Sequence, residues 1–183
     1  MPARKIRLLG GNGMDNLPQR KQLRLRNYDY ANAGYYFVTI CTYGKHNFLC
    51  YICTANPKKG RVTMQNTDIG SLIESSILKI PSIFSGVYVD QYIIMPNHLH
   101  FIIVIEAGRK EAGGHGDPPL QDIIGRFKSF TTYEYNKVNK TKGKLLWQRS
   151  YYEHVIRNED KLNSIRQYII DNPAKWQDDK YFN

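Results

Sequence analysis

The sequence predicts an α+β domain of the ferredoxin-like type, in which an antiparallel sheet carries helices on one face. Runs of β-branched and aromatic residues indicate strands, and apolar residues at helical spacing indicate helices. Their order along the chain is strand, helix, strand, strand, helix, strand, which is the split βαβ arrangement. One more helix follows near the C-terminus. A chain of 183 residues that is 42% hydrophobic suits one well-packed domain with additions.

The expected organisation has three parts. Residues 1–27 form a basic N-terminal arm in which Asp15 is the only acidic residue. This arm is interpreted either as a tail without a specific role or as a segment that contacts phosphates. Residues 28–177 form the domain, and residues 178–183 form a short C-terminal tail.

The first half of the domain begins with a strand at 35–43, which is dense in aromatic and β-branched residues. Short runs at 47–54 and 61–65, separated by turn residues, predict a peripheral hairpin. Asp68 is a candidate cap for an amphipathic helix that Pro81 ends.

The second half begins with strands at 87–95 and 98–105, joined by a tight turn. A glycine-rich loop at 107–117 leads to a helix whose apolar face starts at Leu120. A strand at 145–156 follows. Asn158 is the expected N-cap of the last helix, which ends before Pro173.

The charge balance favours a polyanionic partner. The chain has 26 Lys and Arg against 16 Asp and Glu, a net charge of +10 and a pI near 9.5. No apolar run approaches the roughly 20 residues that span a bilayer, and no secretory signal is recognisable, so we expect a cytoplasmic protein without membrane contact. The pattern GxxxxGK[ST] is absent, and we therefore expect no nucleotide cofactor.

The three cysteines permit two interpretations. Cys41, Cys50 and Cys53 could bind zinc together with His46, because these ligand types suit the metal. Their spacing supplies only one CxxC pair, and Cys41 lies inside an expected strand. Free thiols are therefore the favoured interpretation.

Two groups of residues can carry chemistry. His98 and His100 are two positions apart in a strand, so both imidazoles point to the same face and can share a metal ion. The alternative is that they are packing residues. Tyr168 and Asn172 lie four positions apart in the last helix and project from one side of it. Tyr151 and Tyr152 are rival tyrosines, but adjacent strand residues point to opposite faces.

Three motifs in this order resemble the single-tyrosine HUH transposases, and most closely their REP-associated, insertion-sequence-like group. The motifs are MPNHLH at 95–100, WQRSYYEHVIRNE at 147–159 and YIIDNP at 168–173. The resemblance spans roughly 23–177.

The resemblance implies a DNA transposase that cleaves and rejoins single-stranded or hairpin DNA through a 5′-phosphotyrosine. Tyr168 matches the nucleophile, whereas His98, His100 and Asn172 match the residues that hold a divalent ion, Mg²⁺ or Mn²⁺. The family leaves open whether the chain acts as a monomer or a homodimer, and whether the tyrosine helix packs on its own sheet or on a partner's.

Basic and aromatic residues are the candidates for DNA binding through phosphate neutralisation and base stacking. The alternative is a solvated basic surface. A nucleic-acid-binding module without catalysis, including a transposase that has lost activity, and a metal-dependent hydrolase are the competing classes of function. The DNA-binding candidates are Arg126, Lys128, Trp147 and Arg149.

Overall fold

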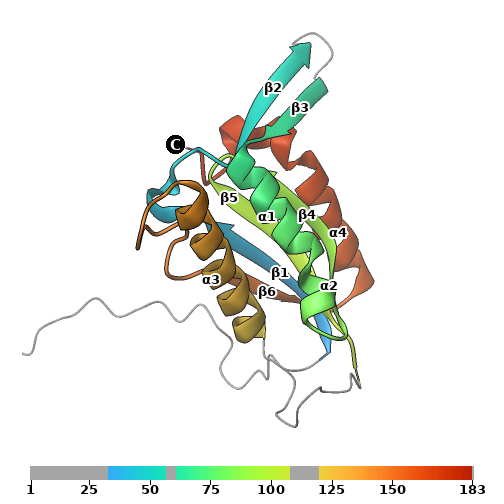
Figure 1. Ribbon diagram of the computed structural model, residues 1–183. Coiled ribbons are helices and arrows are strands. Elements are labelled where there is room, and N and C mark those ends of the chain that lie inside the picture. The colour runs from blue at the N-terminus through green and yellow to red at the C-terminus, as the bar shows by residue number, and fades with distance from the viewer. Residues whose placement is uncertain (1–32, 57–60, 108–119, 183) are drawn as a thin grey trace, which may run out of the picture.

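A computed structural model describes residues 33–56, 61–107 and 120–182. Its centre is a four-stranded antiparallel sheet in the order β4-β5-β1-β6. The strands are β1 (Gly34–Cys41), β4 (Val87–Met95), β5 (His98–Ile105) and β6 (Tyr152–Ile156). This strand order confirms the predicted ferredoxin-like fold (Figure 1).

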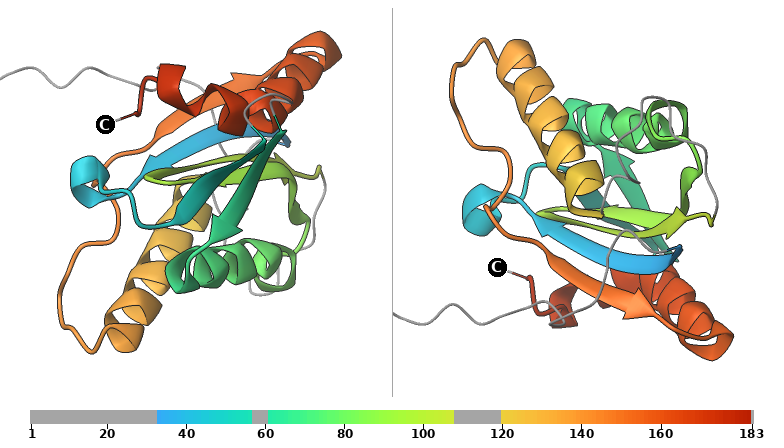
Figure 2. Two further views of the ribbon diagram at one scale, coloured as in Figure 1. Left: turned by 90° about the horizontal axis from the view of Figure 1, so that it is seen from above. Right: turned by 90° about the horizontal axis from the view of Figure 1, so that it is seen from below.

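Helices cover both faces of the sheet. Helices α1 (Asp68–Leu78) and α3 (Leu120–Val138) lie on one face, and α4 (Glu159–Asp171) lies on the other (Figure 2). The two helices that the split βαβ order requires therefore share a face as predicted, and the additional C-terminal helix packs on the opposite side. A short helix, α2 (Ile80–Ile83), follows α1.

The alternation of side chains along β5 produces two separate cores. Phe101 and Ile103 point toward α1 and α3 and belong to the larger apolar cluster. Ile102 and Val104 point the other way and pack against Ile165 and its neighbours on α4. The histidines of β5 lie on this second face, so α4 and the imidazoles share one side of the sheet.

A two-stranded hairpin of β2 (Cys50–Asn56) and β3 (Arg61–Asn66) stands apart from the main sheet (Figure 1). This confirms its predicted peripheral place. A single 3₁₀ turn, η1 (Tyr43–Lys45), connects β1 to the hairpin segment.

The structure corrects three expected ends, both ends of α1 and the start of β6. Thr67, and not Asp68, caps α1, because its hydroxyl accepts a hydrogen bond from the Gly70 amide. Helix α1 ends at Leu78, and Pro81 lies in the first turn of α2, where its missing N–H costs nothing. Strand β6 is shorter than the predicted 145–156, since the segment before it makes only one bridge, between Trp147 and Thr42.

Two predicted features lie wholly or mostly outside the described residues. They are the basic arm at 1–27 and the glycine-rich loop at 107–117 beyond its first residue. Within the described ranges, no helix has the length and apolar character needed to cross a bilayer.

Candidate functional site

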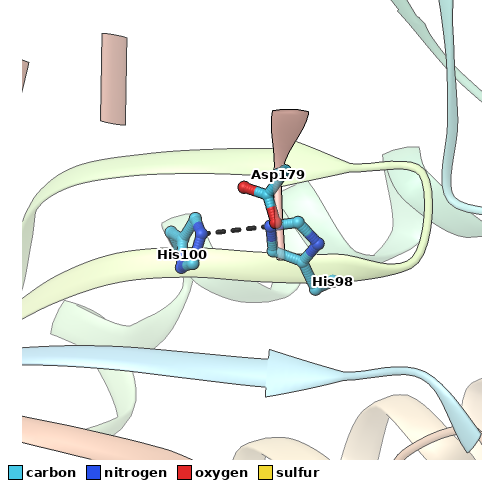
Figure 3. A group of neighbouring side chains, drawn as sticks. All are labelled: His98, His100 and Asp179. Atoms are coloured by element: carbon cyan, nitrogen blue, oxygen red, sulfur yellow. Dashed lines mark hydrogen bonds between the residues drawn. The ribbon is translucent and has the colours of Figure 1, made fainter. Parts of the chain in front are cut away.

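The imidazoles of His98 and His100 meet on the α4 face of the sheet. Their Nε2 atoms lie 3.0 Å apart, and both side chains are 0% exposed. The separation of two positions in β5 places them on one face, as predicted. Figure 3 shows the two rings side by side on their strand.

Each imidazole is oriented by a hydrogen bond at its other ring nitrogen. Nδ1 of His98 lies 2.9 Å from Oδ1 of Asn97, and Nδ1 of His100 lies 2.8 Å from Oγ1 of Thr39. Because an amide oxygen only accepts, the His98 Nδ1 carries the proton of that bond. A neutral His98 therefore presents the lone pair of Nε2 toward His100, which is the arrangement of a metal-ligating histidine.

The surroundings keep both imidazoles neutral. Burial lowers the pKa of His98 to about 4, with Lys180 and Lys45 acting in the same direction and Asp179 acting against it. Burial, the neighbouring His98 and Lys180 hold the pKa of His100 well below its ordinary value. Neutral imidazole is the form that binds a metal ion.

Tyr168 reaches this pair from α4. Its hydroxyl oxygen lies 3.2 Å from Nε2 of His100, and its ring packs edge-on against Phe37. Ile165 and Ile169, on the buried stripe of the same helix, dock α4 on the sheet and thereby fix this position. Burial, followed by the nearby Asp179 and Tyr181, raises the pKa of the Tyr168 phenol to about 12.

The rival tyrosines occupy different places. Tyr151 packs against the larger core on the α3 side, with the Lys128 ammonium over its ring. Tyr152 lies on β6 opposite Thr39 and has its ring 6.3 Å from that of Phe37. Of the three tyrosines that the sequence singled out, the hydrogen bond to an imidazole of the pair is made by Tyr168.

Asn172 has a buried amide oxygen without a partner. The residue ends α4 and is 2% exposed, and its Nδ2 donates to Oδ2 of Asp179 at 3.1 Å. Its Oδ1 has no hydrogen-bond partner among the described residues. Burying an oxygen without a hydrogen-bond partner costs free energy of folding unless another group binds that oxygen, and a cation is one candidate.

Asp179 is the residue that the sequence analysis missed. Its carboxylate and the ring nitrogens of His98 and His100 offer ligand atoms that all lie within 4.8 Å of one another (Figure 3). Asp179 lies in the segment that we expected to be only a tail. Neither a motif nor a periodic pattern marks it, because a long-range contact brings it to the site.

These groups fit a divalent ion. Two ligands on adjacent positions of an octahedral ion at about 2.1 Å are separated by about 3.0 Å. The two Nε2 atoms are 3.0 Å apart, the Asp179 carboxylate belongs to the same group of ligand atoms, and Asn172 is hydrogen-bonded to that carboxylate. Imidazole, amide and carboxylate donors together suit Mn²⁺ and Mg²⁺.

Two of the predicted DNA-binding residues, Arg126 and Lys128, do not lie beside this pair. Arg126 and Lys128 are on α3, across the sheet from α4. Lys128 donates hydrogen bonds to the carbonyl groups of Gln148 and Arg149 at 2.7 and 2.9 Å, so it fastens that segment. Of the four candidates, the exposed ones are Arg126 and Arg149.

Trp147 is placed differently from our expectation of a base-stacking residue. Its side chain is 4% exposed, and its indole N–H donates to the Thr131 hydroxyl at 2.8 Å. A tryptophan enclosed in this way offers no free ring face to a nucleic-acid base, so the structure makes Trp147 a core residue. The shortening of β6 has the same origin, since the segment around Trp147 packs against α3 instead of continuing the strand.

The structure does not assemble the alternative zinc site. Cys41 and Cys50 are buried, whereas Cys53 is exposed on the hairpin. Cys50 donates its S–H to the Ile94 carbonyl, and burial raises the pKa of its thiol to about 12. Within the described ranges, the one group of three potential metal ligands is His98, His100 and Asp179.

Comparison with known proteins places this chain in a family. The family model described as "Transposase IS200 like" matches residues 46–172. An uncharacterised protein of Haemophilus influenzae is 33% identical over 179 residues, which cover 89% of this chain and 93% of that protein.

Two solved structures are also similar. A REP-associated tyrosine transposase bound to a REP hairpin shares 18% identity, with a TM-score of 0.50 over 84% of this chain and 73% of the other. A transposase-like protein of Deinococcus radiodurans shares 16% identity, with a TM-score of 0.42 over 81% of this chain and 95% of that one. The first likeness supports the fold. Because the family model covers more than half of the chain, the protein belongs to the IS200-like transposase family.

Proposed function

We propose that this transposase cleaves and rejoins single-stranded or hairpin DNA through a covalent bond to Tyr168, with a divalent ion at the His98 and His100 pair. One observation carries the proposal. The Tyr168 hydroxyl lies 3.2 Å from Nε2 of His100, which lies 3.0 Å from Nε2 of His98. A phenol beside two buried, neutral imidazoles is the arrangement that a metal-assisted tyrosine nucleophile needs.

The reaction is a phosphoryl transfer in two steps. The Tyr168 oxygen loses its proton and attacks the phosphorus, and the bond from phosphorus to the 3′ oxygen breaks. The departing oxygen takes up a proton to become a 3′-hydroxyl, and the 5′-phosphate remains on the tyrosine. In the second step, the 3′-hydroxyl of another DNA end attacks the phosphotyrosine and releases the phenol. One phosphodiester is exchanged for another, so no nucleotide cofactor is required.

His98, His100 and the amide oxygen of Asn172 are the proposed ligands of Mg²⁺ or Mn²⁺. The ion would polarise the scissile phosphate and stabilise charge on the departing oxygen. The chain's own task is to hold the phenol at this place. Because burial raises the pKa of Tyr168 to about 12, its hydroxyl stays protonated at neutral pH and needs such assistance to react.

The proposed DNA substrate is single-stranded or hairpin DNA. The similar REP-associated transposase was solved with a REP hairpin, and this chain carries a net charge of +10. The exposed Arg126 and Arg149 are proposed to contact phosphates.

A second candidate is a family member that binds DNA without cleaving it. The observation in its favour is the complete burial of both imidazoles, which keeps a phosphodiester away from them in this conformation. The two candidates differ in whether a covalent bond to DNA forms.

The deciding experiment is incubation of the protein with single-stranded hairpin DNA and Mn²⁺, followed by a denaturing gel. The transposase proposal predicts a protein–DNA adduct that a chelator prevents. Tyr168→Phe should abolish the adduct and retain DNA binding, whereas the matched control Tyr152→Phe should still form it. An adduct that survives Tyr168→Phe would exclude Tyr168 as nucleophile, and binding without any adduct would favour the second candidate.

A further inference from the structure

The chain that follows α4 turns back over the imidazole pair. It forms a 3₁₀ helix, η2 (Asn172–Asp178), and then crosses the site with residues 179–182. The Tyr181 ring lies 4.6 Å from that of His98 and 5.9 Å from that of His100, and the Trp176 ring lies 5.9 Å from that of His98. Residues 176–182, called the closing segment below, thus help to bury both imidazoles.

Polar contacts fasten the closing segment to the histidine strand. Nδ2 of Asn97 donates to the Tyr181 carbonyl at 2.8 Å, so the residue that orients His98 also holds the segment. The Lys180 ammonium lies over the rings of Tyr181 and Tyr152, at 4.9 and 5.4 Å. These contacts bring Asp179, which lies next to Lys180, to the imidazoles.

Within the described ranges, the Asp179 carboxylate has hydrogen bonds but no salt bridge. It accepts from Nδ2 of Asn172 at 3.1 Å and from the Tyr181 amide at 2.7 Å. No Lys or Arg side chain in the described ranges forms a salt bridge with it. A half-buried carboxylate beside two neutral imidazoles is a donor that a divalent cation would bind.

We propose that Asp179 is a ligand of the same divalent ion, so that binding of the ion closes the segment over the site. This inference rests on the metal site of the proposed function. A carboxylate oxygen is the donor that Mg²⁺ and Mn²⁺ prefer, and two histidines with one carboxylate form a common ligand set that leaves other positions open. Asp179 thereby takes a position that an oxygen of the scissile phosphate could otherwise occupy.

The two ends of the Asn172 side-chain amide have different roles in this arrangement. Its Nδ2 is bonded to Asp179, and its Oδ1 is the buried atom without a partner. The amide thus holds the Asp179 carboxylate with one end and offers an oxygen with the other. Departure of the closing segment removes the acidic ligand and leaves Asn172 at the C-terminal end of α4, one turn beyond Tyr168.

The alternative interpretation is that Asp179 has a purely structural role and does not contact an ion. In that case its hydrogen bonds with Asn172 and Tyr181 would only fix the shape of the chain end. The two interpretations differ in the affinity for Mn²⁺, which a purely structural carboxylate would not change.

The test is calorimetric titration of the full chain with Mn²⁺ alone, in the absence of DNA. We expect Asp179→Ala to weaken Mn²⁺ binding about tenfold or more, since it removes a charged ligand. The matched control is Asp178→Ala, which removes the same charge from the exposed neighbouring residue and should leave the affinity unchanged. His100→Ala should abolish binding at this site.

Limited digestion with trypsin supplies a second measurement. Lys175 and Lys180 lie beside and within the closing segment, and both are exposed. Mn²⁺ should slow cleavage after these lysines in the wild-type chain and in Asp178→Ala, and should have no such effect in Asp179→Ala. Thermal unfolding in a chelator checks that each variant folds, and Asp179→Asn, which keeps the size of the side chain, replaces the alanine variant if that one does not.

The outcomes separate the two proposals. If His100→Ala loses Mn²⁺ and Asp179→Ala retains wild-type affinity, Asp179 is not a ligand and the proposed function stands. If the wild-type chain binds no Mn²⁺ that depends on His100, both the metal site of the proposed function and the role of Asp179 are overturned. Equal proteolytic protection in the Asp179 and Asp178 variants would overturn the coupling between the ion and the closing segment.

Discussion

At the scale of single residues, the site depends on which atoms the two imidazoles turn toward each other. Asn97 and Thr39 hold the Nδ1 atoms, so both Nε2 atoms face the interior of the site. Neither residue touches the expected position of the ion, yet each decides whether a lone pair is available there.

Removal of one of these supports should weaken metal binding. Thr39→Val keeps the shape of a buried side chain and deletes the hydroxyl that bonds His100, so we expect Mn²⁺ affinity to fall about tenfold to a hundredfold. Calorimetry measures this change. The control is Thr63→Val, whose hydroxyl bonds the Cys53 carbonyl in the hairpin. Equal affinities of the two variants would contradict the orienting role.

The lowered pKa of His98 predicts how the metal-free chain responds to acid. Its folded pKa of about 4 lies below the ordinary value of 6.5, so the unfolded chain binds more protons between these pH values. The free energy of unfolding should therefore fall as the pH drops from 6.5 toward 4, by roughly 3 kcal/mol from this group.

Urea unfolding in a chelator at several pH values tests that prediction. The fall should be smaller in His98→Gln and unchanged in His46→Gln, because His46 is exposed in the same region. An identical pH dependence in all three proteins would show that burial of His98 does not set the acid response.

At the scale of elements, the placement of α4 decides where the phenol lies. Besides its apolar stripe, α4 is joined to the edge strand β4 by Arg166. The guanidinium group donates to both oxygens of Asp90, at 2.8 and 2.6 Å. Asp90 lies where β4 departs from regular register, between Val89 and Gln91. The irregularity places a carboxylate opposite Arg166, which lies two residues before Tyr168 in the chain.

Loss of this ion pair should loosen α4 more than it destabilises the fold. In a double-mutant cycle of Asp90→Ala and Arg166→Ala, we expect a coupling energy of about 1 kcal/mol, since both side chains are partly exposed. We also expect slower formation of the protein–DNA adduct in Asp90→Ala, measured on denaturing gels. Glu159→Gln alters the more exposed 3.7 Å contact of Arg166 and serves as control. An unchanged adduct rate in Asp90→Ala would show that the ion pair does not position Tyr168.

At the scale of the whole molecule, the proposed phosphate contact Arg126 and the reactive groups lie on different sides of the sheet. The imidazoles and Tyr168 are on the α4 face, whereas Arg126 lies on α3 across the sheet. A nucleic acid that contacts both regions has to pass around an edge of the sheet, which a bent or single-stranded molecule does more easily than a rigid duplex.

Salt should therefore weaken binding of hairpin DNA steeply. If Arg149 contacts a phosphate, Arg149→Gln should lower the slope of log affinity against log salt by about 1. Lys79→Gln, which removes the same charge at the exposed end of α1, should leave the slope unchanged. A titration followed by fluorescence anisotropy measures both. Equal slopes in the two variants would assign Arg149 to the general basic surface.

Sequence reasoning reached those parts of the site that depend on local periodicity. The spacing of His98 and His100 determined their common face, and the spacing of Tyr168 and Asn172 determined theirs. The sequence alone did not predict that Asp179 belongs to the site, because the position of Asp179 depends on how the chain end folds back over β5. It misplaced Trp147 for a related reason: an aromatic residue beside basic ones suggests stacking, but only tertiary contacts show that Thr131 receives its N–H.

The alternation along β5 makes metal binding dependent on the correct pairing of this strand. Phe101 belongs to one core and His100 to the opposite face, and they are neighbours in the chain. A shift of one residue in the register of β5 would place the imidazoles in the apolar core on the other face and turn Phe101 toward Tyr168. Chelation is then possible only in a correctly aligned sheet, and uptake of a cation would report native strand alignment before any DNA is present.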